Sequence, residues 1–201
     1  MLDHTLRLKA NSCTGNDVQI DDIVIRGVFL DLTRVSRLLD RDRSCFRLEP
    51  LTYQEILISV VYRLLYRCAL AGDRLDNVND NACHLGILAL MTTLFFQHGR
   101  RLRISYALLA KKLRNATESM AGQGLMGSTM FLWLLFVGGI SVFDAKDRDW
   151  LLPRIRECLS IHDIDNWEHA RQRIRELPWF NTVHDIPAEE LWKATWDIQE
   201  C

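Results

Sequence analysis

The run Met130-Phe131-Leu132-Trp133-Leu134-Leu135-Phe136-Val137 decides the fold, because eight successive apolar side chains cover every side of a helix and need burial on all of them. The surrounding stretch from Ser119 to Phe143 carries no charge and is long enough to span a bilayer. Five glycines interrupt that stretch, however, and the run is far shorter than the roughly 20 apolar residues that a membrane helix needs. We therefore expect a central helix wrapped by others, and no membrane insertion.

The sequence on both sides of this run is typical of amphipathic helices. Apolar residues recur at intervals of three and four, as Tyr53, Leu57, Val60 and Leu64 do in one segment. With capping and breaking residues, this period predicts helices over 21–39, 52–72, 82–98, 104–120, 129–137, 147–160, 165–177 and 187–199. The sequence therefore predicts an all-α fold, an irregular bundle of about seven or eight antiparallel helices. This single helical domain is expected over 18–201, after a flexible arm at 1–17.

Local signals place several of the expected helix ends. Thr52-Tyr53-Gln54-Glu55 matches a capping box, so we expect a helix to begin at Thr52. Gly99 is expected to cap the helix over 82–98, and Gly138-Gly139 to end the central helix. The segment from Val18 to Leu32 is rich in β-branched residues, so a strand is the alternative there.

Charge and cysteine content exclude several classes of protein. Lys and Arg number 25 against 26 Asp and Glu, a net charge of -1, so the chain has no bulk attraction for nucleic acid. The basic cluster from Arg100 to Arg114 contains one aromatic residue, Tyr106, and is interpreted as a solvated loop and helix face. Six cysteines without any Cys-x-x-Cys spacing are typical of buried, reduced thiols in an intracellular protein. Direct DNA binding by this chain is therefore not expected.

The segment Gly122-x-Gly124-x-x-Gly127 matches the dinucleotide-binding fingerprint in its letters, and Asp144 follows about twenty residues later. The fingerprint binds pyrophosphate only where a strand delivers the glycines to the N-terminus of a helix. Here the preceding element is an expected helix that ends near Met120. We interpret the glycines as a connection between two helices, and expect no cofactor.

No residue pattern indicates a metal site or a catalytic site. Cys158 and His162 are one helical turn apart, but zinc needs three or four ligands and no second pair has suitable spacing. His162-Asp163 and His184-Asp185 could each orient an imidazole, yet neither has a nucleophile near it in sequence. We therefore expect neither a metal nor an enzymatic activity.

Tryptophan is unusually frequent, with six residues, five of them from Trp150 onward. Core packing is the first explanation, since each buried aromatic contributes roughly 2–3 kcal/mol by area. A groove for a partner helix is the second explanation, and Trp179, Trp192 and Trp196 are the residues that would line it.

Four segments carry a family resemblance: Phe131 to Gly139, Arg148-Asp149-Trp150-Leu151-Leu152, Asn166-Trp167-Glu168-His169-Ala170 through Leu177-Pro178-Trp179, and Glu190-Leu191-Trp192. Together they resemble the C-terminal regulatory region of fungal zinc-cluster transcription factors. The resemblance covers about residues 20–200 and is specific only after about residue 129. It implies a regulatory role in the nucleus, through effector sensing, dimer contacts or recruitment of transcription machinery.

The DNA-binding module of that family has six closely spaced cysteines around two zinc ions, and this sequence has no such cluster. The expected function is therefore a transcription-regulatory domain that acts by protein or effector contacts without its own DNA reader. One alternative is a stand-alone helical interaction protein that modulates a related factor as a homo- or heterodimer. Another is an enzyme with a helical pocket.

Overall fold

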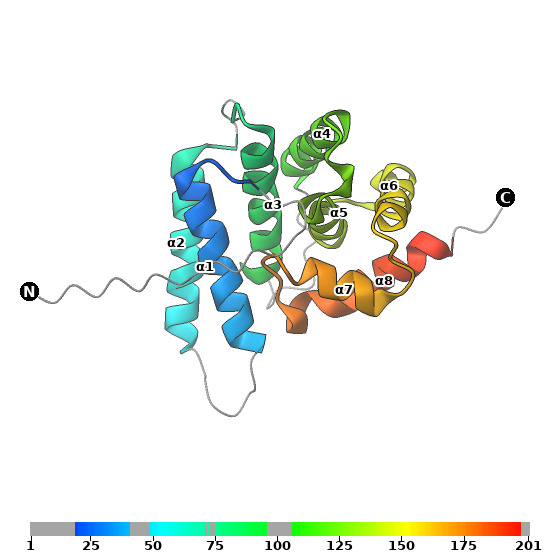
Figure 1. Ribbon diagram of the computed structural model, residues 1–201. Coiled ribbons are helices and arrows are strands. Elements are labelled where there is room, and N and C mark those ends of the chain that lie inside the picture. Colours follow the sequence, from blue (N-terminus) through cyan, green and yellow to red (C-terminus); the bar gives the residue numbers. More distant parts are fainter. Residues whose placement is uncertain (1–18, 41–48, 71, 73–74, 96–105, 198–201) are drawn as a thin grey trace, which may run out of the picture.

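A computed structural model describes residues 19–40, 49–70, 72, 75–95 and 106–197 of the chain (Figure 1). Over these residues the chain forms eight α-helices and no strand, so the predicted all-α fold is confirmed. The arm expected at 1–17 and the cap expected at Gly99 lie outside the described residues. The helices are α1 (Ile23–Asp40), α2 (Pro50–Arg67), α3 (Val78–Phe95), α4 (Ala107–Gly122), α5 (Thr129–Ser141), α6 (Arg148–Ile161), α7 (Trp167–Ile174) and α8 (Asn181–Trp196). Two short 3-10 turns, η1 (Leu125–Gly127) and η2 (Ala145–Asp147), flank α5.

Helix α5 occupies the centre of the molecule. Every residue from Met130 to Gly138 is buried, as expected for a helix that is apolar on all sides. It contacts α3, α4, α6, α7 and α8, which surround it in Figure 1. Over the described segments, none of the helices combines the length and apolar character needed to cross a lipid bilayer.

Helix α3 is the second buried helix and lies directly against α5. A side chain at Gly86 would place its Cβ 2.5 Å from both Leu134 Cδ2 and Trp133 Cζ3. Glycine at this position therefore allows the two helices to approach each other closely, because no other residue leaves room for the indole ring.

Helix α5 does not end at Gly138-Gly139, so the prediction of a stop there is wrong. The helix continues to Ser141, and both glycines are packing positions. A Cβ at Gly138 would overlap the ring of Phe143, and one at Gly139 would lie 2.5 Å from Leu191 Cδ2. The missing side chains let α8 and the loop after α5 lie against its backbone.

Three predicted helix starts also need correction. Helix α2 begins at Pro50 after Glu49, without the Thr52 capping box, because proline is well suited to the first helical position. Helix α3 begins at Val78, where the Asn77 side chain accepts bonds from the amides of residues 79 and 80 at 2.8 and 3.1 Å. Helix α8 begins at Asn181 and contains Pro187, at which the sequence predicts its start. The strand alternative is also wrong over the described residues 19–32, which enter α1.

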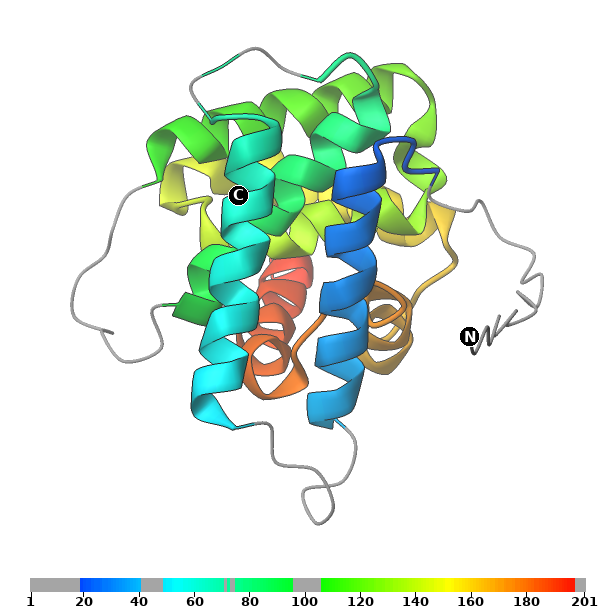
Figure 2. The ribbon, with the colours of Figure 1, turned by 90° about the vertical axis from the view of Figure 1, so that its left-hand side faces the viewer.

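Helices α1 and α2 form an outer layer on one side of the molecule. Figure 2 shows them side by side in front of the other helices. Helix α1 has extensive contacts with α2, α3 and α8. Among the described helices, α2 has extensive contacts with α1 and α3 alone. One long side of α2 is therefore left without a covering helix in the described part of the chain.

Candidate functional site

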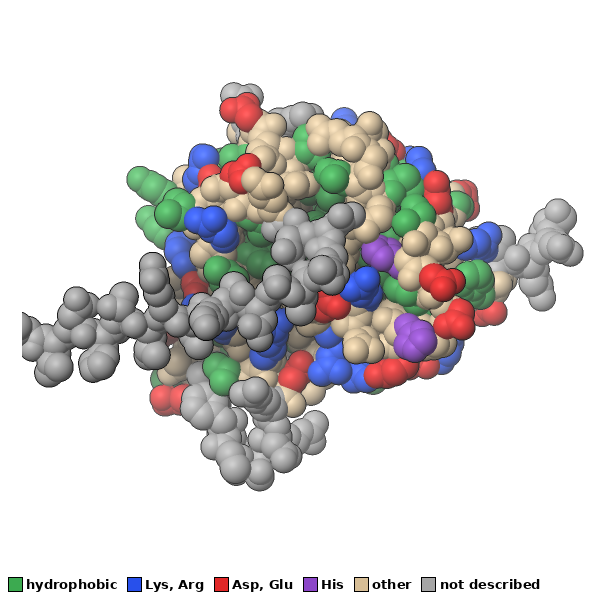
Figure 3. Space-filling view, viewed as in Figure 1, with side chains coloured by type: hydrophobic (Ala, Val, Ile, Leu, Met, Phe, Trp, Pro, Cys, Tyr) green, Lys and Arg blue, Asp and Glu red, His purple; other side chains and the backbone are tan. Residues whose placement is uncertain are grey.

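The outer side of α2 carries a row of exposed apolar side chains, which we call the α2 stripe. The spacing between successive members is seven residues, then four, and then three or four to the last two. This spacing places them along one side of a helix. They are Leu51, Ile58, Tyr62, Leu65 and Tyr66, with exposed fractions of 66%, 52%, 70%, 45% and 85%. Scattered exposed apolar residues are normal on a protein surface, but the contiguous row from Ile58 to Tyr66 indicates an interaction site. The exposed turn with Glu55 separates Leu51 from this row. Hydrophobic side chains protrude at the edge of the molecule where α2 lies (Figure 3).

Two tyrosines dominate the exposed area of the stripe. The rings of Tyr62 and Tyr66 stack with centroids 6.3 Å apart and an angle of 15° between their planes. Tyrosine combines a large apolar ring with a polar end and loses little conformational freedom on binding. The stacked pair therefore has the chemistry of an interface anchor.

The helical period of the sequence predicts only one apolar face of α2, so the stripe was not expected. Leu57, Val60 and Leu64 are indeed buried, as the period predicts. The signal for a second face was present, since Ile58 and Tyr62 continue a separate apolar row outside that period. A helix at the surface needs one apolar row to pack against its own core, so a second row is available for another contact.

An apolar pocket of about 380 Å³ lies beside the stripe, between α2, α3 and α4. It is lined by Val61, Leu65, Leu70, Leu88, Met91, Thr92, Phe95, Tyr106 and Leu109. Leu65 belongs to both features, so the apolar surface continues from the stripe into the pocket. The hydroxyl of Thr92 donates to the Ala89 carbonyl at 2.7 Å, so this polar group is already satisfied. The pocket suits an uncharged, apolar group.

Two ion pairs hold α2 against α1. Arg63 contacts Asp31 at 2.9 Å, and Arg67 Nε contacts Asp22 Oδ2 at 2.5 Å. The other carboxylate oxygen of Asp22 accepts bonds from the amides of Val24 and Ile25 at 2.9 and 3.1 Å, which caps α1. Burial acts to raise the pKa of Asp22, but these amides and the Arg67 guanidinium outweigh it and keep the pKa below its ordinary value.

The charged residues of α2 divide between its two halves. Glu49 and Glu55 are exposed at the N-terminal half, whereas the arginines at 63 and 67 occupy the C-terminal half. The arginines lie toward α1, where Asp31 and Asp22 neutralise them. The charge beside the stripe is therefore that of the two glutamates at its N-terminal end.

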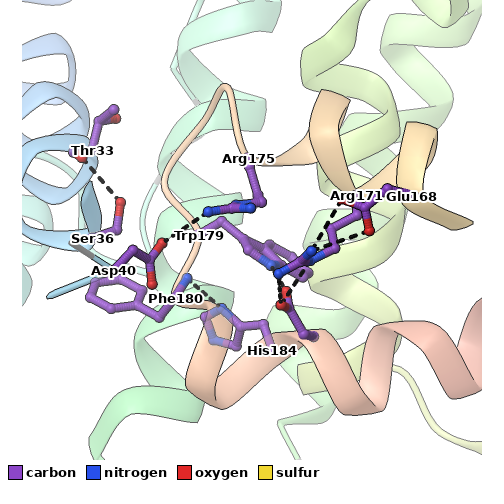
Figure 4. A network of polar contacts seen from close by, with 10 residues as sticks. Thr33, Ser36, Asp40, Glu168, Arg171, Arg175, Trp179, Phe180 and His184 are labelled. Atoms are coloured by element: carbon purple, nitrogen blue, oxygen red, sulfur yellow. Dashed lines mark hydrogen bonds and ion pairs between the residues drawn. The ribbon is translucent and has the colours of Figure 1, made fainter. Parts of the chain in front are cut away.

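Trp179 takes part in a network of polar contacts in the C-terminal half (Figure 4). Trp179 Nε1 donates to Asp185 Oδ1 at 2.8 Å, and Arg171 contacts Asp185 Oδ2 at 2.9 Å from Nε and 2.8 Å from its NH2 group. Arg171 also contacts Glu168 at 3.2 Å. The carboxylate of Asp185 in α8 thus links Trp179, just before α8, to Arg171 of α7.

His184 is buried in the same region and is fully engaged. Its Nδ1 accepts from the Phe180 amide at 3.1 Å, so the ring proton resides on Nε2, which lies 2.8 Å from the Thr93 hydroxyl. That hydroxyl donates in turn to the Leu90 carbonyl at 2.6 Å. Burial lowers the pKa of His184 to about 3, so the ring is neutral. The residue is a structural link between α3 and α8.

The three tryptophans predicted to line a partner groove do not share an open surface. Trp179 and Trp192 are 1% and 8% exposed, whereas Trp196 is 47% exposed. Trp192 packs edge-on against Trp196 with centroids 5.7 Å apart, and Trp179 contacts His184 instead. Core packing accounts for the first two, so a groove lined by all three is not formed.

A polar hollow of about 560 Å³ lies between the C-terminal ends of α1 and α7. Its wall includes Asp40, Arg175 and Trp179, which Figure 4 shows. Arg175 lies 3.9 Å from Asp40, and Arg37 donates to the backbone carbonyl of Glu176 at 3.3 Å. Burial raises the pKa of Asp40 despite the nearby arginine. Both cations thus bind acceptors across the hollow and hold the C-terminal end of α1 against the segment that follows α7.

The glycine segment between α4 and α5 connects two helices. Gly124 has a left-handed backbone with φ 75°, and η1 follows it directly. No strand precedes it, because α4 runs to Gly122. The geometry that a dinucleotide fingerprint needs is therefore not formed at these residues.

Cys158 is a buried thiol that contacts the backbone. Its Sγ lies 3.3 Å from the Met126 carbonyl, and burial raises its pKa to about 12. Among the residues that the structure describes, no three His, Cys, Asp or Glu side chains are grouped to hold a metal ion. Cys158 and His162 thus contribute to packing between α6 and the segment before α5.

Comparison of the chain with protein-family models, with curated proteins and with solved structures finds no match.

Proposed function

We propose that this chain is a transcription-regulatory interaction domain, which acts by binding another protein through the α2 stripe and the pocket beside it. The observation that carries the proposal is the row of five large apolar side chains along one side of α2. Water-exposed rows of this kind are unfavourable when left open, and burying them against a partner recovers roughly 25 cal/mol per Å².

The transcriptional part of the proposal is supported by the resemblance of the C-terminal half to the regulatory region of fungal zinc-cluster factors. The residues that carry this resemblance are scaffold residues: Trp133 bonds to the Pro178 carbonyl at 2.9 Å, and Trp179 bonds to Asp185. They hold the bundle while α2 presents a separate surface. The partner under this proposal is a regulatory chain of the same kind, in a homo- or heterodimer, and the site of action is the nucleus.

Direct DNA binding and catalysis are not part of the proposed function. The stripe is apolar and the net charge is -1, whereas DNA affinity depends on clusters of positive charge. His184 is neutral and fully bonded, and the pocket beside α2 has an apolar lining. The domain acts by contact, and any DNA reading belongs to another chain.

The direct test joins the chain to a heterologous DNA-binding module in fungal cells and measures transcription of a reporter gene. The wild-type chain is expected to change reporter output, and the double variant Tyr62→Ala/Tyr66→Ala is expected to lose this effect. Both tyrosines are exposed, so their truncation leaves the core intact. The control Ile161→Ala/Ile186→Ala removes exposed apolar side chains from α6 and α8 and should behave as wild type. A wild-type chain without effect on the reporter, or a double variant with full effect, contradicts the proposal.

A further inference from the structure

We propose that the occupant of the α2 stripe is the α2 stripe of a second copy of this chain, packed antiparallel across a two-fold axis. This inference rests on the proposed function, because it names the partner of the same surface. Figure 2 shows α2 at the outside of the molecule, where a second copy can reach it without moving another helix.

The exposed area of the stripe matches what a dimer needs. The two tyrosines, 70% and 85% exposed, together present roughly 300 Å², since an aromatic side chain buries about 200 Å². The three aliphatic side chains are 66%, 52% and 45% exposed and add roughly 200 Å² of apolar area. A standard interface buries about 800 Å² on each partner, of which about 60% is apolar. The stripe thus supplies the apolar part of one standard interface.

The stripe is complementary to itself when two copies run antiparallel. A two-fold interface requires one surface to fit the same surface reversed. Leu51 and Ile58 form an aliphatic half, and Tyr62 and Tyr66 form an aromatic half. In antiparallel packing centred between Ile58 and Tyr62, the aromatic half of each copy covers the aliphatic half of the other. Aromatic rings at the centre of an interface are the residues that contribute most to binding.

Charge selects the antiparallel direction. Glu49 and Glu55 lie at one end of α2, whereas Arg63 and Arg67 at the other are paired with Asp31 and Asp22. Parallel packing brings the glutamates of the two copies together, and antiparallel packing keeps them apart at opposite ends of the interface. The helix dipoles of two antiparallel helices also oppose each other favourably. With 18 residues, α2 is about 27 Å long, enough for both halves to meet.

The experiment is measurement of molar mass by sedimentation of the purified full chain across the micromolar range, with Tyr62→Lys as the disrupting variant. The wild type is expected to form a dimer. Tyr62→Lys places a charge at the centre of the interface and is expected to weaken association at least 30-fold. The matched control Ile186→Lys adds the same charge at an exposed site on α8 and should dimerise as wild type does. Circular dichroism checks that each variant keeps its helical content.

A further variant tests the direction of packing. Glu55→Gln removes a charge that parallel packing would bring against its own copy, so parallel packing predicts stronger association at low salt and antiparallel packing predicts association close to that of the wild type. A Glu55→Gln dimer that is clearly more stable at low salt overturns the antiparallel arrangement. A wild-type chain that stays monomeric, or a dimer that survives Tyr62→Lys, overturns the proposed occupant. If the wild-type chain is monomeric but Tyr62→Ala/Tyr66→Ala still loses reporter activity, the second copy is ruled out as the occupant. The proposed function then stands with a different partner.

Discussion

The indole nitrogen of Trp133 donates a hydrogen bond to the backbone carbonyl of Pro178, 2.9 Å away. The bond joins the middle of α5 to the segment before α8, across 45 residues of sequence. The same ring fills the space that Gly86 leaves on α3. Trp133 therefore connects α5, α3 and the segment before α8, and its neighbours fix the scaffold from which α2 presents its stripe.

Replacing Trp133 by Phe should destabilise the fold by about 2–4 kcal/mol, because it leaves a cavity and an unpaired buried carbonyl. The measurement is the free energy of unfolding in urea. Trp196→Phe is the matched control and should cost well under half as much, since Trp196 is partly exposed. Equal losses in the two variants would show that Trp133 is not the central packing residue.

Two glycine substitutions should change stability in opposite directions. Gly86→Ala places a Cβ 2.5 Å from the rigid indole of Trp133 and should destabilise by about 1–3 kcal/mol. Gly27→Ala on α1 meets nothing within 4 Å and should stabilise by about 0.5–1 kcal/mol through helix propensity. Thermal unfolding of both variants checks the pair. A stabilised Gly86→Ala would contradict the close approach of α3 and α5.

His184 should make the fold less stable as the pH falls. Its pKa is about 3 in the folded state, below the value of about 6.5 in the unfolded chain, so the unfolded state binds more protons between these values. Its contribution is complete above about pH 6.5 and is lost as pH falls, with a slope approaching about 1.4 kcal/mol per pH unit. We expect unfolding free energies of His184→Gln to fall less steeply between pH 6.5 and 5 than those of the wild type. Parallel slopes would show that the ring is charged or solvated in the folded chain.

The thiols of Cys83 and Cys158 should resist alkylation in the native protein. Both are fully buried, and burial raises the pKa of each, in Cys158 to about 12. The reactive thiolate is therefore scarce at pH 8. Mass spectrometry of peptides after iodoacetamide treatment should find these two residues modified only in urea. Rapid modification without denaturant would contradict the packing of α3 and α6.

The central helix could be predicted from sequence because an uninterrupted apolar run needs burial on every side. Its length could not, because Gly138 and Gly139 look like helix-ending residues until Phe143 and Leu191 are seen packed against them. Helix propensity is a local quantity, whereas these glycines are selected by a contact with residues distant in the chain. The start of α2 at Pro50 was missed for a different reason, since two local signals competed and proline prevailed.

The candidate surface was harder to predict than the fold. The high tryptophan content suggested a surface at Trp179 and Trp192, but both are buried in the core. It gave no indication of Tyr62 and Tyr66, which are exposed. Sequence shows which residues are apolar, but exposure depends on how many neighbours a helix has. Helix α2 lies at the edge of the bundle, and only the packing of the described helices reveals that none of them covers its second apolar row.

The most direct measurement of the central claim is hydroxyl-radical footprinting of tyrosine side chains at low and high protein concentration. We predict that oxidation of Tyr62 and Tyr66 falls as the α2 stripe becomes covered, while oxidation of the exposed Trp196 stays constant. Equal oxidation of both tyrosines at all concentrations, with protection appearing elsewhere, would contradict the assignment of α2 as the interaction surface.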